Sequence, residues 1–137
     1  MSHIAKIDTQ IKNLGCLKKA LESLGMGYVA PAQGKTLSLP GFRKTEVIDG
    51  CLLEIKTGCA YSIGMRRTED GYEAAADWWA VETFTGNTRE EFLERITRQY
   101  AYQTVMDKAR ALGFSLVSEE EDANANLRIC LRRWSPA

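Results

Sequence analysis

The stretch Thr88–Leu112, TREEFLERITRQYAYQTVMDKARAL, decides the expected fold, because it carries the start, the period and the end of a long helix. Thr88 is a favourable N-cap residue, and Glu91 follows it at the spacing of a capping box. Gly113 stands where helices commonly end in a left-handed conformation. The sequence therefore predicts a helix over residues 88–112.

One broad arc of this stretch is apolar at the helical period, which is typical of a helix packed on a sheet. The arc contains Phe92, Leu93, Ile96, Tyr100, Ala101, Thr104, Val105, Ala111 and Leu112. The opposite side carries Arg95, Arg98, Gln99, Tyr102 and Met106. Arginine, tyrosine and methionine are enriched at protein interfaces, so this side is a candidate protein interface. The alternative is that Tyr102 and Met106 are ordinary surface residues or contact a neighbouring strand.

The chain before this helix predicts strands and one shorter helix. Residues 3–11 alternate as a half-buried strand, and a helix then runs from the N-cap Asn13 to Gly25. Three strands in a row, expected to pair as antiparallel neighbours, follow at residues 45–55, 59–65 and 72–82. Residues 26–44 contain both internal prolines and little periodicity, which indicates a long loop.

After the long helix, residues 114–118 and 127–134 predict two strands joined by the polar turn EEEDANAN. The expected order is strand, helix, three strands, helix, two strands. This order favours an α+β two-layer sandwich with a mainly antiparallel sheet and two helices on one face. It is close to a ferredoxin-like arrangement with an extra hairpin, and we expect residues 1–137 to form a single domain.

The composition excludes several classes of protein. Eighteen basic and eighteen acidic residues give a formal net charge of zero, so nucleic-acid binding is not expected from bulk charge. No apolar run is long enough to span a bilayer and the first residues lack the pattern of a leader, so we expect a cytoplasmic protein with no membrane role. The four cysteines form no CxxC pair, and we interpret them as reduced and mostly buried.

Four blocks of this chain resemble a known family. They are MSHIAKIDTQIKNLGCLKKALESLG, DGYEAAADWW, REEFLERITRQYAYQTV and LRICLRRW, and they cover more than half of the chain in the right order. The resemblance is to the hypothetical chloroplast reading frame thirty-five family of cyanobacteria, plastids and other bacteria, a domain of unknown function. It implies a small protein without an assigned catalytic residue, and plastid stroma as the location if the gene is organellar. Genes of the family often lie near one for a AAA-type ATPase, which implies an accessory role.

A second candidate surface lies on the last predicted strand, at Arg128, Arg132, Arg133 and Trp134. Basic side chains beside an aromatic ring can hold a nucleotide through stacking and phosphate contacts. Arginines also protect the edge of a sheet from pairing with other chains. With zero net charge and no RNA-binding motif, we favour the edge interpretation and keep nucleic-acid binding as the alternative.

Catalytic signals are sparse. Glu73 and Asp77 share one face of a predicted strand and can in principle share a proton or a metal, but no third ligand completes a site. The single histidine, His3, is expected on the inward side of the first strand as a structural residue. No phosphate-binding, dinucleotide, serine-hydrolase or zinc-protease motif is present. We predict no catalytic residue, no metal and no cofactor, and a small-ligand enzyme is the third possibility.

These observations favour a binding or adaptor protein that is not an enzyme. The expected partner is a protein, with a AAA-type ATPase as the candidate from the resemblance. A homodimer formed through an exposed strand or the outer helix face is also consistent with the pattern.

Overall fold

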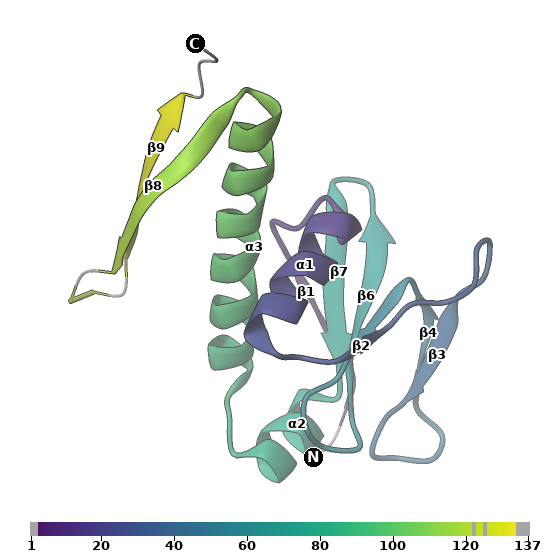
Figure 1. Ribbon diagram of the computed structural model, residues 1–137. Coiled ribbons are helices and arrows are strands. Elements are labelled where there is room, and N and C mark those ends of the chain that lie inside the picture. Colours follow the sequence, from purple (N-terminus) through teal and green to yellow (C-terminus); the bar gives the residue numbers. More distant parts are fainter. Residues whose placement is uncertain (1–2, 122, 125, 134–137) are drawn as a thin grey trace. The chain divides into compact units, whose positions relative to one another are not determined.

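The computed structural model describes residues 3–121, 123–124 and 126–133. The chain divides into two compact units, Met1–Tyr100 and Ala101–Ala137, and the boundary falls within helix α3 (Arg89–Ala111). The first unit contains a five-stranded sheet, a two-stranded sheet and two further helices (Figure 1). The second unit contains the end of α3 and a two-stranded hairpin. The mainly antiparallel α+β class is therefore confirmed.

The five-stranded sheet of the first unit has the order β1-β7-β6-β5-β2. Its strands are β1 (Ala5–Asp8), β2 (Tyr28–Val29), β5 (Leu53–Ile55), β6 (Ile63–Thr68) and β7 (Gly71–Ala76). Every neighbouring pair is antiparallel. A separate two-stranded sheet pairs β3 (Leu37–Pro40) with β4 (Val47–Cys51).

Three helices contribute to the core on one face of the five-stranded sheet. They are α1 (Leu14–Leu24), α2 (Trp78–Thr85) and the part of α3 that belongs to the first unit. Leu17 and Leu21 of α1 and Phe92 and Ile96 of α3 are buried in one cluster with sheet residues such as Met65. Burying such side chains contributes about 1.5–3 kcal/mol each, so this cluster is the main source of stability in the unit.

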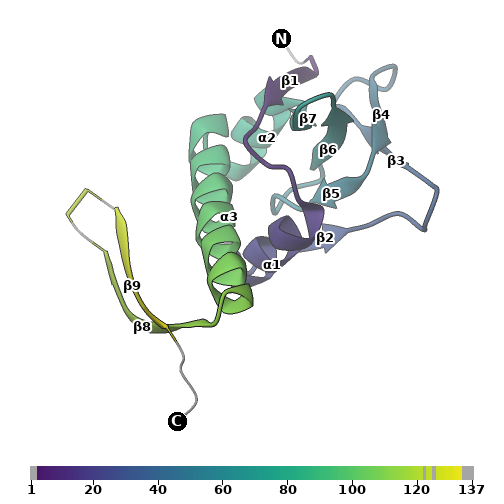
Figure 2. The ribbon, with the colours of Figure 1, turned by 90° about the horizontal axis from the view of Figure 1, so that it is seen from above.

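The other face of the sheet is covered by β3 and β4 (Figure 2). Leu39, Ile48 and Cys51 from these strands are buried against Ala75 of β7. Gly64, the partner of Ala75 in the register, leaves the space that this packing needs. A Cβ atom at Gly64 would lie 2.5 Å from Cys51 Sγ and 3.0 Å from Leu39 Cδ1. The small pair Gly64 and Ala75 thus sets how closely the second sheet approaches.

The hydroxyl of Tyr100 in α3 connects the start of α1 to the core through hydrogen bonds. Tyr100 is 8% exposed, and its Oη accepts hydrogen bonds from Lys12 N at 3.0 Å and Asn13 N at 3.1 Å. Asn13 in turn caps α1, because its side chain accepts from Cys16 N. These bonds satisfy backbone donors that would otherwise be left without a partner at the helix start.

In the second unit, β8 (Phe114–Glu121) pairs with β9 (Leu127–Arg133) as an antiparallel hairpin. A register shift between Leu116 and Ser118 leaves Val117 without a partner on β9. Tyr102 donates a hydrogen bond to Glu119, so the face of the hairpin that carries Glu119 is turned toward the end of α3. Ile129 and Leu131 share that face by the register, as the sequence predicts.

The predicted ends of helices α1 and α3 are confirmed. Helix α1 begins after Asn13 and stops at Gly25, which has φ of 71°. Helix α3 begins after Thr88, whose Oγ1 accepts from Glu91 N, and Gly113 after it has φ of 85°. Both ends follow the capping rules from which they were predicted.

Three expectations about strands need correction. The predicted strand 72–82 ends at Ala76, and the residues from Trp78 form helix α2, because Asp77 caps it. The predicted strand 45–55 is split between the two sheets near Gly50, which has φ of 72°. The region 26–44 contains β2 and β3 as well as loop. The observed strand order does not confirm the ferredoxin-like arrangement.

The buried stripe of α3 also differs from the predicted arc in its second half. Met106 is 3% exposed, and Gln103 and Ala109 are buried as well. Val105 and Leu112, which the arc places inside, are exposed. The expectation that Met106 lies on a solvent-exposed face is therefore wrong.

Candidate functional site

Four aromatic side chains of the first unit form a continuous cluster of rings. Phe42 contacts Tyr61, Trp79 and Phe84, with ring centroids 6.1, 5.0 and 6.1 Å away. Phe84 also stacks on Tyr61 at 5.7 Å and meets Trp79 edge to face at 6.4 Å. We call Phe42, Tyr61, Trp79 and Phe84 the aromatic cluster.

The aromatic cluster is not part of the buried core. Phe84 is 53% exposed, Phe42 45% and Trp79 40%. Large rings normally bury most of their area, so three rings in mutual contact and half in solvent form an apolar patch with available contact area. Such a patch commonly marks a surface that binds another protein or a ligand.

Asp77 holds the elements that present the aromatic cluster. It is 1% exposed, its Oδ1 accepts from Ala80 N at 3.2 Å, and its Oδ2 accepts from Phe42 N at 2.9 Å. The first bond caps α2, which carries Trp79 and Phe84. The second bond fixes the loop that carries Phe42. One carboxylate therefore positions the three exposed rings relative to each other.

Trp78 and Trp79 take opposite roles because neighbouring residues of a helix point about 100° apart. Trp78 is 5% exposed, belongs to the core cluster and donates from Nε1 to Ala5 O at 3.2 Å. Trp79 is left on the outer side of α2 with Phe84. Of the two tryptophans, Trp78 therefore anchors the core.

A turn brings Tyr61 to the same place. Thr57 Oγ1 donates to Tyr61 O at 2.6 Å, and Tyr61 N donates to Cys59 Sγ at 3.5 Å. These bonds hold the segment between β5 and β6 in a fixed conformation. Because hydrogen bonds position Phe42, Tyr61 and the helix of the other two rings, the cluster is preorganised for binding.

Basic side chains lie beside the aromatic cluster. Arg43 and Lys44 follow Phe42 directly, and both are exposed. Arg43 forms a long ion pair with Glu46, at 4.0 Å. Two exposed basic residues therefore directly follow one ring of the aromatic cluster in the sequence.

The interface predicted on the long helix is only partly a surface. Arg95 and Arg98 are exposed and Gln99 is half-buried. Arg95 lies over the ring of Phe92 at 6.0 Å and lines a depression of about 310 Å³ with residues such as Lys56 and Asn87. Tyr102 belongs to the second unit, where it bonds Glu119, and Met106 is buried. An interface role for the exposed members stays a prediction.

The second predicted surface is not assembled on one face. In the hairpin, Arg128 pairs with Glu120, Arg132 with Ser115 and Arg133 with Phe114. Alternation along β9 places Arg133 on the opposite face from Arg128 and Arg132. Trp134 lies outside the described residues, so the stacking that a nucleotide would need stays a prediction.

The carboxylates considered for catalysis have structural partners. Glu73 pairs with Arg66, with 3.2 Å between Oε1 and Nε, and Asp77 is bonded as described above. His3 is exposed and precedes β1, so its expected place on the inward side of that strand is wrong. Among the residues that the structure describes, no three histidine, cysteine or acidic side chains gather as metal ligands do.

The cysteines are less uniformly buried than expected. Cys16 and Cys51 are buried, Cys59 is partly buried and Cys130 is exposed; none of the four forms a disulfide. Burial raises the pKa of the Cys51 thiol from 9.0 to about 11. No helix within the described ranges is both long and apolar enough to cross a bilayer.

The family of the chain follows from comparison with known proteins. Residues 20–130 match the family described as "Protein of unknown function (DUF1257)". The chain belongs to this family. The family resemblance noted from four sequence blocks is thereby confirmed.

Relatives within the DUF1257 family extend over nearly the whole chain. The "Uncharacterized protein ycf35" of Cyanophora paradoxa is 31% identical over 137 residues, covering 98% of each chain. That of Guillardia theta is 30% identical over 142 residues, covering 99% of this chain and all of the relative. That of Pyropia yezoensis is 24% identical, with 98% and 99% coverage. No solved structure matches the chain.

Proposed function

We propose that this protein is a binding or adaptor domain that recognises another protein through the aromatic cluster. The observation that carries the proposal is the set of three rings that are 40–53% exposed although they touch one another. Exposed aromatic side chains held in fixed positions are typical of the residues that dominate binding energy at protein interfaces.

The chemistry around the cluster favours one kind of partner segment. An apolar side chain suits the rings of Phe42 and Phe84, which offer no hydrogen bond, whereas Tyr61 and Trp79 each add one polar group to the cluster. The neighbouring Arg43 and Lys44 favour acidic residues beside that anchor. The proposed ligand is therefore a protein segment with an apolar anchor and flanking acidic residues.

A AAA-type ATPase, expected as a partner from the family resemblance, is the first candidate to test for such a segment. The nucleic-acid alternative, which uses the arginines of the last strand, has weaker support, because Arg133 lies on the opposite face from Arg128 and Arg132 and the chain has zero formal net charge. The third possibility, a small-ligand enzyme at the Asp77 carboxylate, is opposed by the burial of Asp77 and by its two backbone partners.

The experiment compares variants of equal exposure inside and outside the cluster. Phe84→Ala removes the most exposed ring, and Val47→Ala removes an apolar side chain of similar exposure, 52%, from strand β4. Tagged wild-type and variant chains are used to purify partners from the source organism, and the partner is then prepared pure. The dissociation constant of the complex that the partner forms with the wild type, with Phe84→Ala and with Val47→Ala is then measured by isothermal titration calorimetry.

We expect Phe84→Ala to weaken binding by about tenfold or more, as interface aromatics commonly do, and Val47→Ala to leave it unchanged. Equal dissociation constants for wild type and Phe84→Ala would contradict the proposal. If the purified partner is a nucleic acid, binding that weakens steeply with salt identifies the alternative instead.

A further inference from the structure

We propose that the free edge of β8 pairs with β8 of a second copy of this chain. The two β8–β9 hairpins would then form one four-stranded antiparallel sheet across a two-fold axis. This surface lies in the second unit and is independent of the aromatic cluster.

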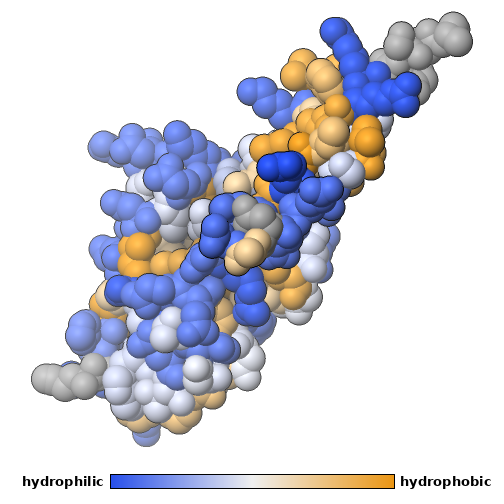
Figure 3. Space-filling model, turned by 90° about the vertical axis from the view of Figure 1, so that its left-hand side faces the viewer, coloured by the Kyte–Doolittle hydropathy of each residue, from blue (hydrophilic) through white to orange (hydrophobic). Residues whose placement is uncertain are grey.

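Strand β8 of the hairpin has little packing, although Ile129 and Leu131 of β9 are partly buried. Isolated two-stranded hairpins are marginally stable in water, and further strands or a covering helix are needed. Yet every β8 residue after Phe114 is exposed, including Leu116 and Val117 at 40% and 58%. Leu127 of β9 is 36% exposed. Figure 3 shows exposed apolar residues in orange among hydrophilic residues in blue.

The two edges of the hairpin differ in charge. Strand β9 carries Arg128, Arg132 and Arg133, and charged residues of this kind keep an edge from pairing. Strand β8 carries its three glutamates at the turn end and has no charged residue or proline from Phe114 to Ser118, whereas the uncharged run of β9, residues 129–131, has arginines on both sides. In the described part of the chain, β8 pairs with β9 alone. The β8 edge is therefore the one open to a further strand.

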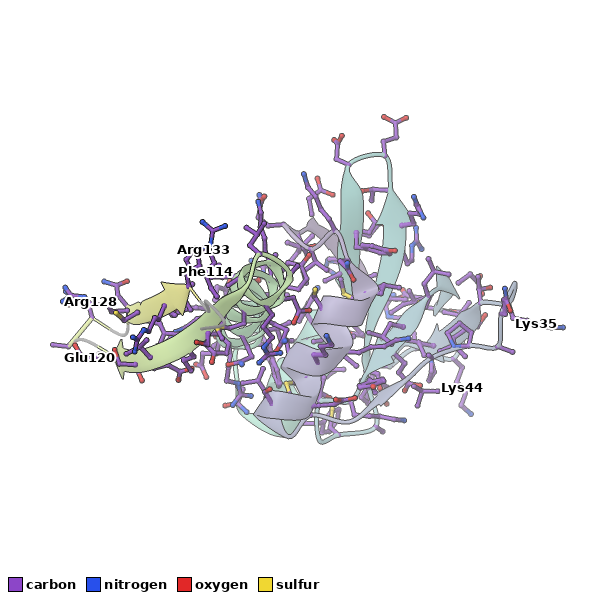
Figure 4. The ribbon with its side chains drawn as sticks, turned by 45° about the horizontal axis from the view of Figure 1, so that its top comes forward. Lys35, Lys44, Phe114, Glu120, Arg128 and Arg133 are labelled. Atoms are coloured by element: carbon purple, nitrogen blue, oxygen red, sulfur yellow. The ribbon has the colours of Figure 1, made fainter. Side chains whose placement is uncertain are left out.

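Charge complementarity indicates that the strand paired with β8 belongs to a second copy of this chain. The acidic residues Glu119–Glu121 lie at the end of β8 near the hairpin turn, whereas Arg132 and Arg133 lie at the other end, beside Ser115 and Phe114. Figure 4 shows Glu120 with Arg128 toward the turn and Phe114 with Arg133 at the opposite end. An antiparallel β8–β8 contact brings the acidic end of each copy to the arginine end of the other.

The spacing of strands allows these charges to meet. Neighbouring strands lie about 4.8 Å apart, so a Glu120 side chain of the second copy and Arg132 are separated by only one intervening strand. The residue between them is Ser115, which is small and does not block two long side chains. The contact is isologous, so each dimer contains two such clusters. Pairing through β9 instead would place Arg128 near Arg132 of the second copy, which is unfavourable.

Sedimentation equilibrium on the full chain tests the pairing. The wild type should approach twice the 15.3 kDa chain mass at up to about 100 µM, where a micromolar dimer is largely formed. Val117→Lys places a charge at the centre of the open edge and should raise the dimer dissociation constant by about tenfold or more. Val47→Lys, a change at a comparably exposed valine of the first unit, should leave the dimer unchanged.

A charge-reversal mixture separates the proposed pairing from unspecific association or misfolding. One chain carries Glu120→Lys with Glu121→Lys, and the other carries Arg132→Glu with Arg133→Glu. Each chain alone brings like charges together and should be mainly monomeric. Their equimolar mixture restores opposite charges at both clusters and should be dimeric.

Three results would overturn the proposal. They are a monomeric wild type at about 100 µM, a Val117→Lys dimer as tight as the wild type, or a mixture that associates no better than its two components. The aromatic-cluster variant Phe84→Ala should retain the dimer, so this test is separate from that of the proposed function.

Discussion

The carboxylate of Asp77 joins the backbone of Phe42 to the start of helix α2. Its Oδ2 accepts from Phe42 N at 2.9 Å, and its Oδ1 accepts from Ala80 N at 3.2 Å. The two residues are 35 positions apart in the sequence, and their contact brings Phe42 beside Trp79. A buried acidic residue is thus used to build an exposed aromatic surface.

Replacing Asp77 should reveal this role as a loss of stability. Asp77→Ala removes the cap of α2 and leaves the Phe42 amide without its acceptor, so we expect a loss of about 2–4 kcal/mol in the free energy of unfolding. Urea denaturation followed by circular dichroism measures it. Asp70→Asn, a change at an exposed acidic residue, is the control and should alter stability by less than about 0.5 kcal/mol. Similar midpoints for both variants would show that Asp77 has no such role.

Gly64 should tolerate no side chain while Cys51 is present. The Cβ of Gly64→Ala would meet Cys51 Sγ at 2.5 Å, so the small second sheet has to move, and we expect a loss of about 1–3 kcal/mol. Cys51→Ala removes the sulfur and opens the space. The double variant should therefore be more stable than the sum of the two single losses predicts. Strict additivity in urea denaturation would argue against this steric contact.

The hydroxyl of Tyr100 should contribute to the free energy of unfolding, because it accepts hydrogen bonds from two backbone amides. Tyr100→Phe keeps the ring in the core but removes the acceptor of Lys12 N and Asn13 N, and we expect a loss of about 1–2 kcal/mol. Tyr28→Phe is the matched control, because the Tyr28 hydroxyl bonds the exposed Glu22. That control should cost less than about 0.5 kcal/mol. Thermal and urea unfolding of both variants distinguish the two cases.

The buried thiol of Cys51 should make stability fall at alkaline pH. Burial raises its pKa from 9.0 to about 11, so between these values the folded chain holds a proton that the unfolded chain has released. Its contribution is fully present below pH 9 and is lost as pH rises toward 11. Wild type should lose more stability than Cys51→Ala between pH 8 and about pH 10.5 in urea denaturation. Parallel losses in both proteins would assign the pH dependence to other groups.

Local signals are sufficient to predict α1, α3 and the terminal hairpin, but β8 runs to Glu121, so residues 119–121 of the predicted turn belong to this strand. Asn13 with Gly25, and Thr88 with Gly113, bracket their helices by capping chemistry that depends only on neighbouring residues. The alternation of Leu127, Ile129 and Leu131 fixes one face of β9 in the same way.

Helix α2 was missed because two patterns compete in its sequence. The alternating small residues up to Ala76 predict a strand. Because Trp78 and Trp79 continue the alternation, the predicted strand runs on to residue 82. Asp77 and Gly86 are the cap signals that would have marked the helix. On a helix, adjacent side chains point about 100° apart, so Trp78 and Trp79 lie on different sides of α2, and the structure leaves Trp79 exposed.

The aromatic cluster itself could not be predicted from spacing. Phe42, Tyr61 and Phe84 lie in different segments, and they meet only because β3, β4 and α2 pack on the same sheet. The phase of α3 was likewise decided by packing. Its buried positions advance through Ile96, Tyr100, Gln103 and Met106, whereas a fixed arc places Val105 inside.

Site-specific photocrosslinking tests most directly whether the aromatic cluster binds a protein. The photoreactive residue p-benzoylphenylalanine is placed at position 84 and, as the control, at the comparably exposed position 47 of β4. Irradiation in the source organism should give a discrete adduct with another protein from position 84 alone. The adduct should disappear when Trp79→Ala is added, and the pure partner should bind wild type more tightly than Phe84→Ala. Identical adducts from positions 84 and 47, or none from either, would contradict the account.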